Sequence, residues 1–318
     1  MERLKRKVIY SRPVRSAIRT AQRIALPGFE GFSIYQVGRF FFASLLDGNL
    51  ITRASAISFK LFLAFFPGVL VLLTLIPFIP IADLQVRLLL TFQELMPPAV
   101  YDFAESTLHD LVVKKHGTLL SVSFLVGVYM ASNSIDAILI GFSGSSNLDA
   151  RHSPLKQRLL SLALLLAISV LMIIAIPLLT LTNWIIQLLD PAFFVDHLRT
   201  LGLFVAKYGI SLLLLLTSIA LLFHAGDPKA RRFKLFTPGS ILTLFLVLVV
   251  SKVLAFVFGR ITDYNALYGS IGAILAVQLY IYVNMIVLLI GFELNTSIAR
   301  ARRKHSRVLT VPAPHPVA

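Results

Sequence analysis

Six long apolar stretches, each bounded by charged residues, constrain this chain more than any other feature of its sequence. A helix needs about 20 residues to cross the hydrocarbon core of a bilayer, and each stretch is long enough. Strands are excluded because open sheet edges leave backbone groups unpaired in lipid, and no alternating barrel pattern appears. The sequence therefore predicts an all-α, polytopic membrane protein with six transmembrane helices at residues 56–79, 118–142, 159–189, 201–224, 235–258 and 268–298.

Hydrophobic residues make up 57% of the 318 residues and charged residues 14%, which is more apolar surface than a soluble domain of this length could bury. Lys and Arg fall mainly on one side of the six stretches. That side, which includes both chain ends, carries 23 of the 30, and the opposite side carries six. This positive-inside bias predicts a multi-pass protein with both termini in the cytoplasm.

The net charge of +15 does not indicate a nucleic-acid partner, because the basic residues flank apolar stretches rather than forming a separate soluble domain. Anionic lipid headgroups are the expected counter-charge, so membrane lipids are the predicted partners. A homo-oligomer or an envelope partner protein stays open as a further association.

The segments outside the six stretches divide the chain into a basic tail, a membrane domain and a basic, Pro-rich tail, at residues 1–31, 32–298 and 299–318. Before the first stretch, aromatic residues and Arg39 are typical of an interfacial elbow helix, which the residues from Asp47 to Asn49 should end. The loop 83–117 is too long for an ordinary connection, and its apolar residues follow helical spacing. We predict an outer amphipathic helical cap there.

Polar side chains inside apolar spans cost free energy, so they are candidate functional residues. In the second span, Asn133 and Asp136 lie three residues apart and near one helix face. In the last span, Gln278, Asn284 and Glu293 lie at increasing depth toward the cytoplasm. We predict that these five residues bind substrate or a coupling ion. For Asp136, a satisfied ion pair near the cytoplasmic end is the alternative.

Glu293 needs a cationic partner to stay ionised at bilayer depth, because an unpaired buried charge would neutralise instead. The candidate partners are Arg39, Arg53 and Lys60, which we also predict to bind anionic headgroups. The alternative is a structural salt bridge that pins the elbow helix to the last helix.

Small residues and one proline are predicted to shape the helix contacts. Gly127 and Ala131 belong to a ridge at four-residue steps, and Gly269 and Gly272 form a close-packing edge at the start of the last span. Pro67 should kink the first span, with tolerated packing as the alternative.

Searches for catalytic signatures find none. The chain has no GxxxxGK[ST], HExxH or GxGxxG motif, no Cys, and seven His too scattered to nominate a metal cluster. Ser143 in "GFSGSS" resembles a nucleophile elbow only superficially, because its spacing to the next glycine is wrong and no strand precedes it. We expect a loop there, and a protein that is not an enzyme and holds no cofactor and no metal.

Four segments resemble the YihY/BrkB family of bacterial inner-membrane proteins: "ITRASAISFKLFLAFFPGVLVLL", "ASNSIDAI", "RRFKLFTPGS" and "YGSIGAILAVQLYIYVNMIVLLIGFELN". The most specific part is the YGSxG start and GxELN end of the last span. The resemblance implies six spans, cytoplasmic termini and a location in the bacterial inner membrane. The family long carried the name ribonuclease BN, but a metal-dependent nuclease of that kind needs an HxHxDH ligand cluster that this chain lacks.

The inward polar residues and the interfacial cations together favour a transporter or flippase-like protein for an anionic amphiphile or lipid. A non-catalytic membrane scaffold for envelope assembly, docking through the outer cap, is the alternative. An enzyme acting on membrane lipid is a third class, but it would need a nucleophile or metal that the sequence does not show.

Overall fold

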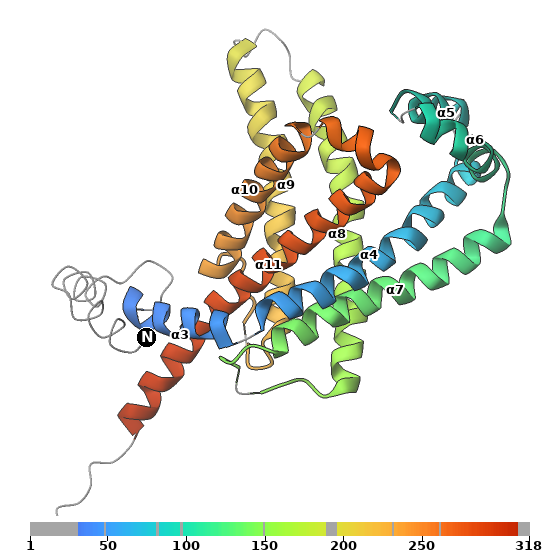
Figure 1. Cartoon of the computed structure of the whole chain (residues 1–318). Helices are drawn as coiled ribbons and strands as arrows, with labels where there is room; N and C mark the ends of the chain where they lie inside the picture. The colour runs from blue at the N-terminus through green and yellow to red at the C-terminus, as the bar shows by residue number, and fades with distance from the viewer. Residues whose placement is uncertain are drawn as a thin grey trace, which may run out of the picture. The chain divides into compact units, whose positions relative to one another are not determined.

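The computed structural model describes residues 31–47, 49–80, 83–95, 98–148, 150–188, 196–230, 232–260 and 262–310. Every regular element within these ranges is helical (Figure 1). In chain order these are α3 (Ile34–Asp47), α4 (Leu50–Leu75), the short 3-10 helix η1 (Ile76–Phe78), α5 (Leu84–Leu95), α6 (Pro98–Val113), α7 (Gly117–Ser143), α8 (Pro154–Leu188), α9 (Asp196–Gly226), α10 (Pro238–Arg260) and α11 (Thr262–Thr310).

Six helical segments are long and apolar enough to cross a membrane: Leu50–Phe78, Gly117–Ser143, Pro154–Ala175, Tyr208–Gly226, Pro238–Phe258 and Ile274–Arg303. Their apolar side chains are largely exposed. In α10 the most apolar window has a mean hydropathy of 2.7, yet only 6% of it is buried inside the protein. Lipid rather than protein would cover such a surface, and the helix satisfies its own backbone hydrogen bonds. The predicted all-α fold with six spanning helices is confirmed.

Several helix boundaries differ from the sequence prediction, and two of them involve the basic residues that flank a span. The first spanning helix begins at Leu50, six residues before the predicted span, and α11 continues past Ile298 to Thr310. In both cases the helix runs on through basic residues, because Arg and Lys have good helix propensity and their charge marks only where lipid ends. Helices α3, α5 and α6 occupy the segments of the predicted elbow and cap; their positions against a membrane surface stay predictions.

The chain divides into two compact units. The first comprises Met1–Ala54, Leu139–Val250 and Ile286–Ala318, and the second comprises Ser55–Ile138 and Ser251–Met285. Helices α4, α7, α10 and α11 each contribute residues to both units.

Within the first unit, three aromatic side chains from α7, α9 and α11 form the centre of the packing. The rings of Phe142 and Phe292 stack with centroids 4.0 Å apart, and Phe223 meets both edge-on at 5.7 Å. Gly226, the last residue of α9, fits against them because a Cβ atom there would come within 2.9 Å of the Phe292 ring. Helix α8 packs against α9 in the same unit.

Helices α10 and α11 of the first unit approach each other through two glycines. A Cβ atom on Gly239 would collide with the carbonyl oxygen of Gly291, and one on Gly291 would overlap the Thr243 hydroxyl. Small residues allow helix backbones this close in a membrane, where van der Waals packing replaces the hydrophobic effect as the source of helix association. This crossing fixes the position of the inner half of α11.

The second unit is held by α4 and α7. A Cβ atom on Gly127 would lie 3.8 Å from Pro67 and from Val71, which is ordinary van der Waals contact, so this part of the predicted ridge faces the proline. Ser134 donates a hydrogen bond of 2.8 Å to the backbone carbonyl of Lys60. In the same unit, α5 and α6 pack against each other and against η1.

At the end of α6, outside the candidate spans, Asp110 accepts a 2.6 Å contact from Lys114 and lies 3.1 Å from His116. The hydrogen bond from the Lys114 ammonium lowers the pKa of Asp110 below its ordinary value. Because these groups are exposed to solvent, we expect the ion pair to contribute little.

Candidate functional site

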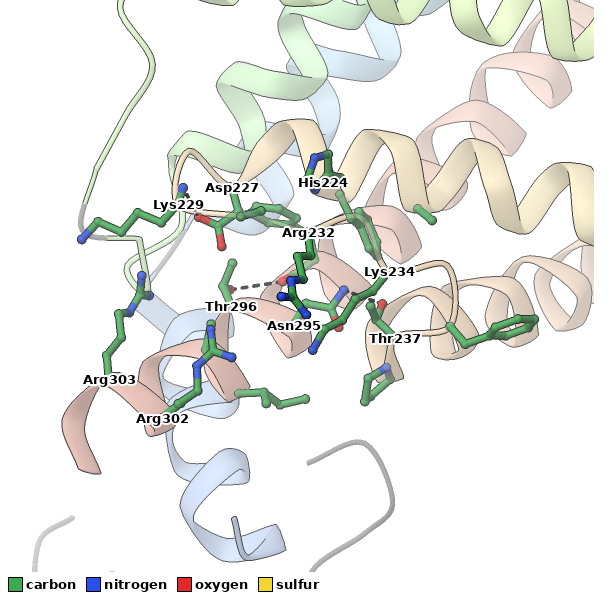
Figure 2. Close-up of a pocket in the computed structure, with 18 residues that line it drawn as sticks. His224, Asp227, Lys229, Arg232, Lys234, Thr237, Asn295, Thr296, Arg302 and Arg303 are labelled. Atoms are coloured by element: carbon green, nitrogen blue, oxygen red, sulfur yellow. Dashed lines mark hydrogen bonds between the residues drawn. The ribbon is translucent and has the colours of Figure 1, made fainter. Parts of the chain in front are cut away.

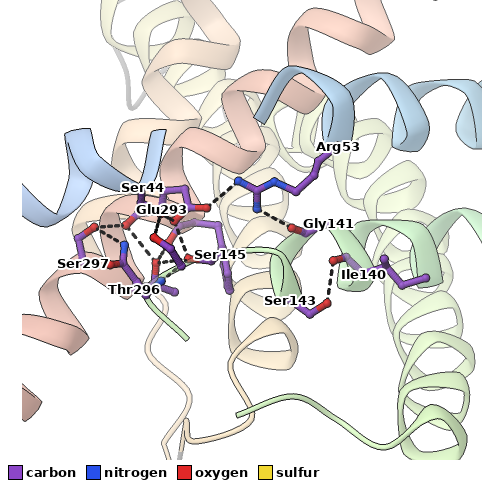
Figure 3. A network of polar contacts seen from close by, with 12 residues as sticks. Ser44, Arg53, Ile140, Gly141, Ser143, Ser145, Glu293, Thr296 and Ser297 are labelled. Carbon is purple, nitrogen blue, oxygen red and sulfur yellow. Dashed lines mark hydrogen bonds and ion pairs between the residues drawn. The ribbon is translucent and has the colours of Figure 1, made fainter. Parts of the chain in front are cut away.

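Glu293 lies at the centre of a buried polar network in the first unit (Figure 3). Its side chain is 0% exposed, and one carboxylate oxygen accepts a hydrogen bond of 2.9 Å from the guanidinium of Arg53, on the first turns of α4. The other oxygen accepts hydrogen bonds from the hydroxyls of Ser44 at 2.5 Å and Ser145 at 2.6 Å. Both oxygens are therefore paired, as a carboxylate removed from water requires.

Arg53 also makes a second structural contact. Besides the ion pair, its guanidinium donates to the carbonyl oxygen of Gly141 at 2.7 Å, near the end of α7. Its side chain is 11% exposed. Ser44 lies on α3, so the network joins α3, α4, α7 and α11. The salt bridge itself links α4 to α11, and α3 is linked to α11 by the Ser44 hydrogen bond.

The loop after α7 is bound to α11 by a second set of contacts. Asn147 donates to the hydroxyl of Ser297 at 2.9 Å and accepts from the guanidinium of Arg300 at 3.0 Å. Arg303 donates to the Asn147 backbone carbonyl at 2.9 Å. In the "GFSGSSN" segment, Gly141 to Ser143 form the end of α7 instead of the expected loop, and Ser143 donates to the carbonyl of Ile140. The loop begins at Gly144, and its side chains anchor α11.

The other predicted site residues lie elsewhere. Arg39 is exposed on α3 of the first unit, whereas Lys60 is half-buried on α4 of the second. Asn133 and Asp136 are both half-buried on α7 of the second unit. Their predicted roles in substrate or ion binding stay predictions.

In the last helix, the amide of Gln278 approaches the Ser58 hydroxyl at 3.5 Å within the second unit. Asn284 donates to the carbonyl oxygen of Tyr280 in its own helix at 2.8 Å. Ala131 is half-buried and Gly272 buried, while the side-chain surroundings of position 269 lie outside the described part of the chain. Neither amide belongs to the network around Glu293.

A basic cavity of about 840 Å³ lies in the first unit, beside the inner end of α11 (Figure 2). We use the name basic cavity for the space between the α9–α10 connection and the last turns of the spanning part of α11. Its lining contains five cationic side chains, one carboxylate and one imidazole, contributed by Lys229, Arg232, Lys234, Arg302, Arg303, Asp227 and His224. Figure 2 shows three of the cations on the α9–α10 connection and two on α11.

An apolar wall adjoins these charges. The aromatic residues Phe223, Phe236 and Phe292 line the same cavity together with Pro238 and Ile298. A cavity that combines apolar side chains with a few charged groups is the usual form of a small-molecule site, and its volume is within the range of about 300–1,000 Å³ for such sites. The arrangement suits a ligand with an anionic part and an apolar part.

The N-terminus of α10 borders the cavity, but its backbone amides are already used. The side-chain oxygen of Asn295 accepts from the Gly239 amide at 2.8 Å, and the Thr237 hydroxyl accepts from the Ser240 amide at 3.1 Å. Asn295 also donates to Thr237 at 2.9 Å. The helix end is capped internally, so an anion in this cavity would be bound mainly by side chains.

Sequence reasoning did not find this cavity. Lys229, Arg232 and Lys234 indicate orientation through the positive-inside rule, and nothing in the sequence pattern shows that they face Arg302 and Arg303. The available signal was the run "KARRFK" combined with "RARRK" after the last span, two basic clusters on the same predicted side. In the part of the chain that the structure describes, no three His, Asp or Glu residues gather as a metal site would need.

These features define a polytopic, helical membrane protein with a buried ion pair, in which both carboxylate oxygens are hydrogen-bonded, and a cation-rich cavity in one unit. Residues 41–314 match the family described as "Virulence factor BrkB", which covers most of the chain, and the chain belongs to this family. The resemblance drawn from its sequence motifs is confirmed.

A relative from Bacillus subtilis (strain 168), named "Putative ribonuclease-like protein YfkH", is 23% identical over 257 residues, which are 79% of this chain and 91% of that protein. The ribonuclease wording is that of the relative's name, and the family is not a known enzyme family. No solved structure matches the chain.

Proposed function

We propose that this protein is a transporter or flippase-like protein for an anionic amphiphile or lipid, located in a bacterial inner membrane with both termini in the cytoplasm. The basic cavity is the observation that carries the proposal: five cations meet an apolar wall in a space large enough for a ligand. Fixed positive charge raises the local concentration of an anionic ligand, and the apolar wall accommodates the part that leaves water.

We propose that the basic cavity, and not Arg53 as predicted from the sequence, binds the anionic headgroup. Arg53 is held by Glu293 and Gly141, so binding a headgroup would first have to break a buried ion pair. The cavity cations Arg232, Lys234 and Arg302 are all exposed, so a ligand can reach them without breaking a buried ion pair. The positive-inside charge bias supports a cytoplasmic location for this cavity.

Reconstituted liposomes test the proposal. Lipids with a fluorescent acyl chain are incorporated, and a membrane-impermeant reductant reports how fast the inner-leaflet fraction reaches the outside. We expect the protein to accelerate movement of phosphatidylglycerol more than that of phosphatidylcholine. Rates for phosphatidylglycerol and for phosphatidate that both equal those of protein-free liposomes would overturn the transporter proposal.

A matched pair of variants assigns the activity to the cavity. Arg232→Gln with Lys234→Gln removes two lining cations, and Arg151→Gln with Lys156→Gln removes two exposed cations of the same unit that do not line the cavity. We expect the first double variant to slow movement and the second to leave it unchanged. Equal slowing by both would indicate a general surface-charge effect and remove the cavity from the proposal.

A non-catalytic scaffold for envelope assembly is the second candidate, and the saturated network around Glu293 is the observation that favours it. A buried acid with both oxygens paired stabilises a helix arrangement without any transport step. A scaffold would co-purify with a stable partner protein and show no thermal stabilisation by anionic lipid, whereas a transporter would be stabilised by the lipid it binds.

A further inference from the structure

We infer that the basic cavity is specific for a terminal phosphate, a phosphomonoester carried on an apolar chain, in preference to a phosphodiester headgroup. This inference rests on the proposed function and specifies the ligand of the same cavity. Five cations lie around it against the single carboxylate of Asp227.

The number of charges is the first argument. At neutral pH a phosphomonoester carries a charge of about −1.5 to −2, whereas a phosphodiester carries a single negative charge. Like charges that line one cavity repel one another, and salt screens this repulsion only in part. A ligand of higher charge offsets more of this repulsion, so the excess of cations favours the dianion.

The placement of the cations is the second argument. Arg232 and Lys234 come from the α9–α10 connection and Arg302 from α11, so donors approach the cavity from two elements (Figure 2). A terminal phosphate presents three oxygens that radiate from phosphorus and can be met from several directions. A diester presents two such oxygens, since its other two carry substituents. Guanidinium groups donate to phosphate oxygens in bidentate pairs, which favours the group with more free oxygens.

The capped N-terminus of α10 strengthens this argument. Because Asn295 and Thr237 occupy the Gly239 and Ser240 amides, backbone recognition of an anion at this helix end is not available. Recognition therefore depends on charged side chains, and it should be sensitive both to salt and to the charge of the ligand.

The apolar wall excludes free phosphate as the natural ligand in this inference. Phe236 is 67% exposed and would be left against water by a small hydrated ion, whereas a chain attached to the phosphate can cover it; Phe223 and Phe292 are already buried in the packing of the first unit. The cavity of about 840 Å³ also exceeds what a single phosphate group needs. The ligand class is thus an amphiphile that ends in phosphate.

Binding measurements on the purified full-length chain test the inference. The probes are dihexanoyl phosphatidate, dihexanoyl phosphatidylglycerol and inorganic phosphate, each titrated at fixed ionic strength below the micellar concentration of the lipid. We expect phosphatidate to bind about tenfold more tightly than phosphatidylglycerol, and inorganic phosphate to bind more weakly than either lipid. Arg232→Gln with Arg302→Gln should remove most of the preference, while Arg151→Gln with Lys156→Gln should keep it.

A pH series isolates the charge of the ligand. His224 and Asp227 also line the cavity, so the series is run on His224→Gln and Asp227→Asn beside the wild type. In each protein the ratio of the two affinities should rise between pH 5.5 and 7.5 as the phosphomonoester loses its second proton near a pKa of about 6. A ratio that does not change with pH would overturn the inference.

The remaining outcomes separate the inference from the proposed function. Equal or tighter binding of phosphatidylglycerol, with lipid movement intact, overturns the inference and leaves the transporter proposal standing. Inorganic phosphate that binds as tightly as phosphatidate would mean that the chain of the amphiphile is not recognised, and this also overturns the inference. If neither lipid binds nor moves, both proposals fail.

Discussion

The network around Glu293 and the basic cavity belong to the same unit and share α11, yet they use polar residues in opposite ways. In the network, each carboxylate oxygen is paired and the acid is fully buried. In the cavity, five cations and one carboxylate line an open space, and Arg303 also donates to the Asn147 backbone. Polar residues of this unit therefore lie either in a closed network or beside a space that a ligand can enter, and geometry separates the two kinds.

The largest expected effect follows from breaking the buried pair. Glu293→Leu leaves the Arg53 guanidinium almost buried without its counter-charge, so we expect the free energy of unfolding to fall by about 3–5 kcal/mol. Thermal unfolding of the purified protein in detergent measures this as a lower Tm.

Arg53→Met with Glu293→Leu is the control for that prediction. Removing both charges should recover part of the loss, because no unpaired charge remains. Recovery should be incomplete, since Ser44 and Ser145 lose their acceptor in either variant. If the single variant unfolds at the wild-type temperature, the pair does not hold these helices and the contrast with the cavity disappears.

The second prediction concerns the helix crossing that connects the two regions along α11. Gly291 lies two residues before Glu293 and four before Asn295, and a Cβ atom there would lie 2.7 Å from the carbonyl oxygen of Gly239 and would overlap the Thr243 hydroxyl. We expect Gly291→Ala to destabilise the protein by about 1–3 kcal/mol, because backbone atoms on both sides cannot yield. The loss should appear as a lower Tm.

Gly209→Ala is the matched control, since Gly209 lies in helix α9 and a Cβ atom there meets nothing within 4 Å. Gly209→Ala should leave the free energy of unfolding unchanged or raise it by about 0.4–1 kcal/mol, because alanine has less conformational freedom than glycine in the unfolded chain. Adding Thr243→Ala to Gly291→Ala should relieve only the side-chain overlap. Equal effects of the two single glycine variants would show that the close crossing is not tightly packed.

The fold could be predicted from the sequence because hydropathy is a local property. The six apolar stretches and the break predicted at Asp47 to Asn49 need no knowledge of the tertiary arrangement, and in the structure α3 ends at Asp47 and α4 begins at Leu50. The ends of the spans were less certain. Helix α11 continues through Arg300, Arg302 and Arg303, since charge marks the edge of the lipid and not the end of a helix.

The sequence could predict a set of candidate partners for a buried polar residue such as Glu293, but not which member of the set it contacts. Arg39, Arg53 and Lys60 all lie on the predicted inner side, and the structure places Arg53 beside Glu293 and leaves Arg39 exposed. Which cation meets the acid depends on how the helices are rotated about their axes, and a single sequence does not contain that rotation. Ser44 and Ser145 were missed for the same reason, because a small hydroxyl residue carries no signal of its partner.

The third prediction concerns the basic cavity, which we compare with the network around Glu293. Arg232→Gln with Lys234→Gln should change the free energy of unfolding by no more than about 0.5 kcal/mol, because both side chains are exposed. The same double variant should weaken lipid binding. Thermal unfolding without ligand, followed by unfolding with phosphatidate, separates the two effects: the wild type gains stability from the ligand and the variant gains less. A large loss of stability without ligand would place these cations among the structural residues, with Arg53.

The smallest expected effect is at the exposed ion pair of Asp110 and Lys114 in the second unit, which has the same charges as the buried pair but is open to solvent. Because the Lys114 hydrogen bond lowers the pKa of Asp110, the pair stabilises the folded state at neutral pH and this contribution is lost as the pH falls through the lowered pKa. Lys114→Met should therefore lower the Tm only slightly at pH 7, and by still less in acid, where Asp110 is protonated in both proteins. Raised salt should reduce the difference further at pH 7. A Lys114→Met effect as large as that of Glu293→Leu would show that burial does not govern the strength of ion pairs in this protein.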